Sequence, residues 1–165
     1  MKNSFFLYII LVLIASCNQN EKTPAEKKDS GSAIDSNIIG LPITNPDLDD
    51  DSIFDDGSKP TAWDVAGITR VYALKIFIKD LQYLVANDNP EEISKLIRYP
   101  LNSTIKTKSD FLANYNKIIT PKIKDALDKA NLRQLFRNYK GVMIGSGEIW
   151  IAQEGKDFKI IAINN

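Results

Sequence analysis

The sequence predicts an α+β domain in which helices pack on one face of an antiparallel sheet. Apolar residues recur with helical spacing between residues 71 and 85. The last thirty residues change to short segments that are rich in β-branched and aromatic residues and separated by glycines. All predicted helices precede these consecutive strands, and this order is typical of helices segregated on an antiparallel sheet.

The first helix is predicted by a stripe of apolar residues at spacings of three and four. The stripe contains Val71, Leu74, Ile78, Leu81 and Val85, widened by Phe77 and Leu84. We expect Lys75, Lys79 and Gln82 on the opposite, solvent-facing side. The predicted helix is long and spans Asp64–Ala86.

Helices and one strand are predicted in the middle of the chain. Asn89 is expected as the N-cap of a helix and Pro90 as its first residue. Glu92 would complete a capping box with Asn89. Pro100 ends that helix, and residues 101–106 are expected as a short strand. A further helix over 109–119 is capped by Ser109 or Thr107, and Thr120-Pro121 begins another.

The remaining strands are separated by turn signals. Gly145-Ser146-Gly147 predicts a tight bend, and residues 154–157 predict a hairpin. Leu135–Tyr139 is a candidate for one further strand. The strands themselves are predicted at 142–144, 148–153 and 158–163.

This order of elements resembles the nuclear transport factor 2-like group, over roughly residues 62–163. The resemblance is carried by the helix Asp64–Ala86, the exit Tyr99-Pro100-Leu101, the helix 109–119 and the closing hairpins from Gly141 to Trp150. It implies a cone in which a curved sheet wraps the long helix, and it permits a homodimer through the exposed sheet face. Because the group includes enzymes, ligand-binding proteins and non-catalytic modules, the fold does not set the function.

The N-terminus has the features of a secretory signal peptide. An apolar run begins at Phe5, only Lys2 precedes it as a positive charge, and Ile14-Ala15-Ser16-Cys17 closes it. The tetrapeptide resembles the lipobox of bacterial lipoproteins, which implies cleavage before Cys17 and acylation of that cysteine. The run is shorter than a membrane-spanning helix, which needs about 20 residues. An uncleaved, membrane-embedded stub is the alternative.

The lipoprotein resemblance implies a permanent lipid anchor, because two or more acyl chains bind a membrane stably. The expected location is the cell envelope. The absence of aspartate after Cys17 favours the outer membrane, facing the periplasm or the surface. We therefore expect a signal peptide over residues 1–16, a lipidated cysteine with a disordered acidic tether over 17–60, and one domain over 61–165.

The tether prediction rests on composition. Residues 18–60 contain ten acidic residues and four lysines and have little apolar periodicity. Residues 47–58 resemble a calcium-binding loop, but Ser52 and Ser58 occupy positions that require Gly and Glu. A solvated linker is the preferred interpretation, and transient docking of this acidic stretch on the basic domain is the alternative.

Composition also limits the chemistry. The chain has no histidine and one cysteine, which excludes Ser-His and Cys-His catalysis and disfavours zinc or copper sites. We expect no cofactor and no metal. Catalysis would have to use carboxylates, lysine, tyrosine or an oxygen-ligated metal.

Two groups of residues are candidates for a site. A ligand-binding or proton-abstracting site at the open end of the cone would contain Tyr99, Asp110, Tyr115 and Trp150, provided that apolar walls raise the pKa of the carboxyl. Capping and core packing are the alternative roles. A basic patch would contain Lys122, Lys129, Arg133 and Arg137. Its partner would be an anionic headgroup or an acidic protein rather than nucleic acid, and a solvated helix face is the alternative.

These observations favour an envelope lipoprotein whose domain binds a ligand or partner without catalysis. A small-molecule enzyme with an Asp/Tyr pair in the cone is one alternative. An envelope inhibitor or immunity-type protein is another. The partner, whether an envelope protein or a small molecule, is not identified by the sequence.

Overall fold

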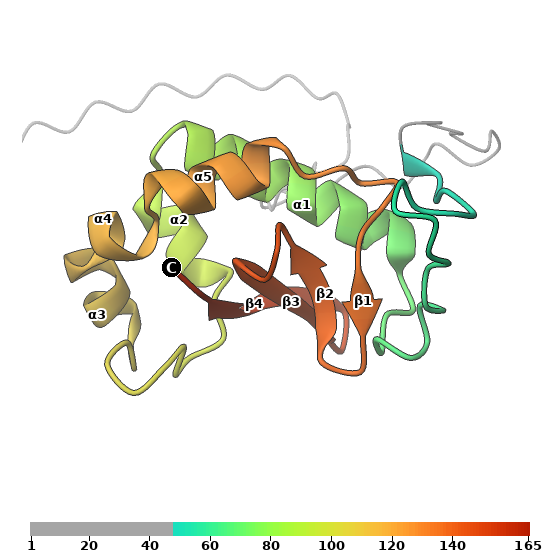
Figure 1. The fold of residues 1–165 in the computed structure, drawn as a ribbon. Coiled ribbons are helices and arrows are strands. Elements are labelled where there is room, and N and C mark those ends of the chain that lie inside the picture. The colour runs from blue at the N-terminus through green and yellow to red at the C-terminus, as the bar shows by residue number, and fades with distance from the viewer. Residues whose placement is uncertain (1–47) are drawn as a thin grey trace, which may run out of the picture. The chain divides into compact units, whose positions relative to one another are not determined.

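The computed structural model describes residues 48–165, which form an α+β domain as predicted. In this part of the chain, five helices pack on a four-stranded antiparallel sheet (Figure 1). The predicted signal peptide 1–16, Cys17 and the predicted tether up to residue 47 lie outside the described residues. Among residues 48–165, no helix is long and apolar enough to cross a membrane.

The first helix, α1, spans Val71–Ala86 and is shorter than predicted. Residues 63–68 instead form consecutive turns, in which Gly67 N–H donates to Asp64 O at 2.9 Å and Ile68 N–H donates to Trp63 O at 3.0 Å. Gly67 has a φ of +67°, in the left-handed region that ends a helical turn. The prediction that the helix begins at Asp64 is therefore wrong.

Two of the short helices begin at predicted N-caps, but the Glu92 side chain accepts from Lys95 instead of completing the predicted capping box. Helix α2 spans Pro90–Lys95, and the Asn89 side chain accepts from Glu92 N–H. Helix α3 spans Lys108–Ala113, with Thr107 and Asp110 forming a capping box. Helix α4 spans Tyr115–Ile118 and α5 spans Pro121–Asp128.

The predicted helix 109–119 is divided at Asn114. This residue has non-helical angles, and its side-chain amide donates to Asp110 O at 2.9 Å. A polar side chain that bonds to nearby backbone competes with continuation of a helix. The break therefore has a local cause in the sequence.

The strand predicted over residues 101–106 is absent from the structure. The Asn102 side chain accepts from Thr104 N–H at 2.9 Å and from Ile105 N–H at 2.7 Å, which folds the segment into a compact loop. Asparagine commonly forms such turns. The only pairing of this region with the sheet is an isolated parallel bridge between Ile97 and Ile160, as far as the described residues show.

The sheet is a simple antiparallel meander in the order β1-β2-β3-β4. Its strands are Arg137–Asn138, Gly141–Ile144, Ile149–Glu154 and Asp157–Ile163. The predicted bend at 145–147 and hairpin at 154–157 connect the last three strands. A register shift beside Trp150 and Ile151 adds one residue to β4.

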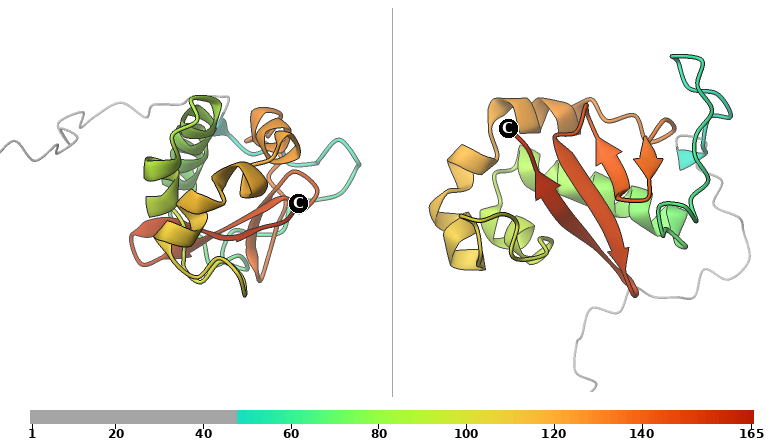
Figure 2. Two further views of the ribbon diagram at one scale, coloured as in Figure 1. Left: turned by 90° about the vertical axis from the view of Figure 1, so that its left-hand side faces the viewer. Right: turned by 60° about the horizontal axis from the view of Figure 1, so that its bottom comes forward.

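The core lies between the helices and one face of the sheet. Views from two further directions show α1 and α5 over the same face of the sheet (Figure 2). Leu74, Ile78, Leu81 and Val85 of the predicted stripe are buried, whereas Val71, Phe77 and Leu84 are half-buried. Lys75, predicted on the opposite side, is buried as well. The other core side chains include Ile93, Phe111, Ile123, Leu127, Val142, Ile144, Ile149, Ile151 and Ile160.

Residues 48–60, which the sequence analysis assigns to the tether, are held against the domain. We call this segment the strap. Leu48 is buried, and Asp51 N–H donates to Arg133 O at 3.0 Å. In this structure Asp50 and Asp51 dock on basic residues of the domain, as the alternative to a solvated linker expects.

Candidate functional site

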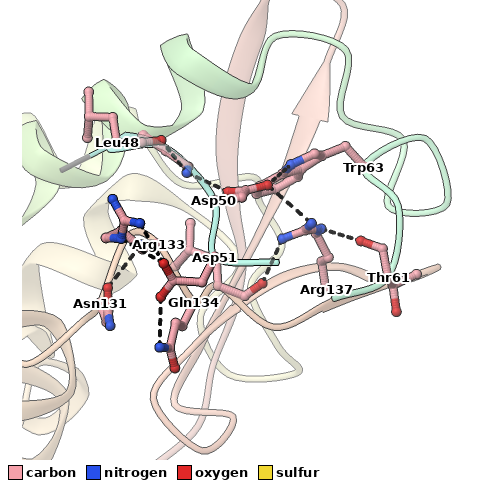
Figure 3. Close-up of polar contacts among 11 residues, drawn as sticks. Leu48, Asp50, Asp51, Thr61, Trp63, Asn131, Arg133, Gln134 and Arg137 are labelled. Carbon is pink, nitrogen blue, oxygen red and sulfur yellow. Dashed lines mark hydrogen bonds and ion pairs between the residues drawn. The ribbon is translucent and has the colours of Figure 1, made fainter. Parts of the chain in front are cut away.

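A cluster of polar side chains joins the strap to the sheet and α1 (Figure 3). The Asp50 carboxylate accepts from Lys75 Nζ at 2.6 Å, from Trp63 Nε1 at 2.5 Å and from Arg137 Nη2 at 3.3 Å. We call these four residues the clasp. Three donors from different parts of the fold thus converge on one carboxylate.

Lys75 is buried, although the sequence analysis placed it on the solvent side of α1. Its side chain is 1% exposed, and its ammonium also donates to Leu48 O at 2.5 Å. A buried ammonium is costly unless it is paired and hydrogen-bonded. The strap supplies both partners, so the burial of Lys75 depends on the strap.

Arg137 has a comparable environment on β1. It is 4% exposed, its guanidinium stacks 3.7 Å from the Trp63 ring, and it donates to Thr61 O at 2.5 Å and to Leu135 O at 3.2 Å. Burial lowers the pKa of the guanidinium, and Asp50 acts in the opposite direction. The cation is fixed in place, and Asp50 is its counter-ion.

The second contact of the strap is made by Asp51. Its carboxylate pairs with Arg133 at 2.6 Å and accepts from Gln134 Nε2 at 2.9 Å. These hydrogen bonds, with that from Gln134 first, lower the pKa of the Asp51 carboxyl. Arg133 and Arg137, predicted as part of one basic surface patch, are instead counter-ions of the strap.

The other two residues of the predicted basic patch are also paired with acids of the domain. Lys122 lies 3.1 Å from Glu148, and Lys129 lies 2.7 Å from Asp125. The Lys122 ammonium and the Ser146 amide lower the pKa of Glu148. The four residues therefore do not form an uncompensated cationic surface.

Two predicted ligand-binding residues, Tyr99 and Asp110, lie close enough to interact electrostatically. The Tyr99 hydroxyl donates to Ser94 O at 3.2 Å, and burial is the main cause that raises its pKa to about 12. Asp110 is half-buried and accepts from the Thr107 and Lys106 amides. Its pKa is lowered, chiefly by Thr107, whereas a proton-abstracting carboxylate would need a raised pKa.

The other two predicted residues lie elsewhere. Tyr115 packs edge-on against Phe111 and donates to Asp88 at 3.1 Å, and its pKa rises to about 12 because of burial and then of that bond. Trp150 alternates with buried Ile149 and Ile151, so it lies on the opposite face of the sheet. The four residues do not converge on one cavity.

The outer face of the sheet, away from the helices, is rich in aromatic residues. Phe136 and Tyr139 are 45% and 79% exposed, and Phe136 packs edge-on against Trp150. A hollow of about 540 Å³ lies beside Tyr139 and Trp150, with Ile161 and Ala162 in its lining. Contiguous exposed apolar surface of this kind marks interaction sites.

The sequence analysis missed the clasp because each member has a common alternative role. Aspartates in a polar run indicate a linker, and a lysine in a helix indicates a solvent-facing position. One signal was present, since Lys75 lies next to Leu74 at the border of the apolar stripe. No group of three or more metal-ligating side chains is found among residues 48–165.

Comparison of the chain with protein-family models, curated proteins and solved structures finds no match in any of the three.

Proposed function

We propose that this chain is a lipid-anchored protein of the cell envelope whose domain binds a protein partner through the outer face of the sheet, without catalysis. The observation that carries the proposal is the exposed aromatic surface around Tyr139 and Trp150. Tyrosine, tryptophan and phenylalanine are enriched in protein interfaces. An envelope inhibitor or immunity-type protein would be one form of this function.

The lipid anchor is proposed from the lipobox alone. The test is to replace Cys17 by alanine in the full chain and to separate membranes from soluble material at high salt. We expect the native chain in the membrane fraction and the Cys17→Ala chain in the soluble fraction. Retention of the variant in membranes would rule out the lipid as the anchor.

The finer assignment of the fold, to the nuclear transport factor 2-like group, is also a proposal. It is supported by helices on one face of an antiparallel sheet and by the contact of the chain after α2 with β4. The shorter α1 and the loop at residues 101–106 depart from the expected pattern. An enzyme of this group is less well supported, because Asp110 caps a helix and Tyr115 packs in the core.

The partner surface is tested by photo-crosslinking in cells. A photoreactive phenylalanine analogue replaces Tyr139 on the sheet, or Tyr83 on the solvent side of α1 as the matched control. We expect a discrete adduct with an envelope protein from position 139 and none from position 83. An adduct of twice the chain mass would identify a second copy as the partner, and equal patterns from both positions would reject the outer face as the site.

A further inference from the structure

The clasp has the composition of a binding site for a carboxylate. Two cations, Lys75 and Arg137, and the indole N–H of Trp63 all point at the two oxygens of Asp50. Both cations are more than nine-tenths buried. Because a buried cation left unpaired is strongly unfavourable, the pocket requires an anion.

Its donors belong to the body of the domain, although the described bonds of Lys75 Nζ and Trp63 Nε1 are made to the strap. Lys75 extends from α1, and Arg137 is held by Leu135 O and by stacking on Trp63. The chain after Trp63 is fixed by the burial of Ile68 and by Thr69 N–H, which donates to Gln153 Oε1 at 2.9 Å. Arg137 and the chain after Trp63 therefore have anchors that do not depend on the strap, and Lys75 is carried by α1.

The strap itself has few other attachments. Its apolar side chain Ile53 is 55% exposed, and residues 55–59 are exposed as well. Apart from Leu48 and the clasp, the strap is held by the half-buried Phe54, by the bonds of Asp51 with Arg133 and Gln134, and by the bonds between Asp55 and Gln134. A segment held by few contacts opens locally at lower free energy than the core.

We propose that Lys75, Arg137 and Trp63 form a binding site for an acidic peptide segment, which the strap fills in cis through Asp50 and which is free to accept another chain when the strap opens. Asp50 is then an intramolecular ligand. The strap acts as a competitor that must be displaced, so the ligand is a polypeptide that offers a carboxylate two residues after an apolar side chain, as buried Leu48 and Asp50 do. This inference is independent of the lipid anchor and of the outer sheet face.

The first test asks whether the strap opens without unfolding of the domain, and it uses the native full chain. Amide hydrogen exchange is compared between Asp51, bonded to Arg133 O, and Ile160, bonded to Leu96 O in the core. We expect the protection of Asp51 to be lower by about tenfold or more. Equal protection of the two amides would mean that the strap leaves only on global unfolding, and would overturn the proposal.

The second test supplies the strap in trans. A fluorescent synthetic peptide with the sequence of residues 48–58 is titrated into the full chain carrying Asp50→Ala, with folding checked by circular dichroism. A matched peptide carries Asp50→Asn. We expect the native peptide to bind the variant, the Asp50→Asn peptide to bind about tenfold more weakly or worse, and the native chain to bind less because its own strap competes.

The titration decides whether the site recognises the carboxylate of Asp50. Equal binding of both peptides would show that the carboxylate is not recognised, and absence of binding to a folded Asp50→Ala chain would show that the pocket does not persist without the strap. Either result overturns the proposal. If Asp50→Ala does not fold, the exchange measurement on the native chain still decides whether the strap opens.

Discussion

The strap and the β3–β4 hairpin are attached to the same domain by different physics. The hairpin is paired along its length and buries Ile149, Ile151 and Ile160 almost completely. The strap buries Leu48 and is otherwise attached mainly by the carboxylates of Asp50 and Asp51. A polar segment can thus be ordered when the body of a domain contains buried cations that need counter-ions.

The largest expected effect comes from removing a buried apolar side chain from the β3–β4 hairpin. Ile151 is fully buried in β3, so Ile151→Ala should lower the free energy of unfolding by about 2–5 kcal/mol. In a Trp150→Phe background, the fluorescence of Trp63 and the far-UV circular dichroism should lose their native values together in urea. The control is Tyr139→Ala on the outer face, where we expect a change within about 0.5 kcal/mol.

The next effect tests whether the strap is a separate unit. Lys75→Met keeps an apolar stem of similar length and removes the ammonium that binds Leu48 O and Asp50. We expect a loss of about 1–3 kcal/mol that is confined to the strap. Faster exchange of the Asp51 amide, with unchanged exchange in β4, is the measurement.

Lys79→Met is the matched control for that variant, because Lys79 is exposed on the same helix. It should leave the exchange of both segments unchanged. If the two variants behave alike, the ammonium of Lys75 does not hold the strap.

A smaller effect concerns pH and Glu148, which pairs with Lys122 and accepts from Ser146 N–H. These bonds lower the pKa of Glu148 below its ordinary value of 4.5. A lowered folded-state pKa gives stability that is present above pH 4.5 and is lost as the pH falls through the folded-state pKa. The urea concentration at the unfolding midpoint should therefore fall less steeply below about pH 4.5 in Glu148→Gln than in the native chain. Parallel pH dependences of the two midpoints would contradict this.

The smallest expected effect is at the exposed ion pair between Lys129 and Asp125, one helical turn apart. Exposed pairs of this kind contribute little because water screens them. Lys129→Ala should leave the urea midpoint unchanged within error. A clear shift would show that the predicted basic surface has a structural role that its contacts do not explain.

Local signals accounted for much of the fold. The apolar stripe of α1, the caps at Asn89 and Thr107, and the hairpin turn at 154–157 each depend on residues close in sequence. Where a predicted helix or strand is shorter or absent, a glycine or a short-range polar interaction interrupts it. Gly67 delays α1, and Asn102 turns the chain where a strand was expected.

The candidate site could not be predicted in the same way. Asp50 and Arg137 are separated by 87 positions, and nothing in their local sequence indicates a pair. Of the predicted group Tyr99, Asp110, Tyr115 and Trp150, the strand alternation places Trp150 on the outer face of the sheet. Which face a residue occupies depends on the register of the whole sheet.

The sequence by itself determined the class of fold, most helix starts and the hairpin order, because periodicity, caps and turns act over a few residues. It also determined that histidine chemistry is absent from the chain. Only the tertiary structure decided that Lys75 and Arg137 are buried and that the acidic strap belongs to the domain. Burial of these charges depends on a counter-ion from a distant segment, and the two charges lie close together only in the folded chain.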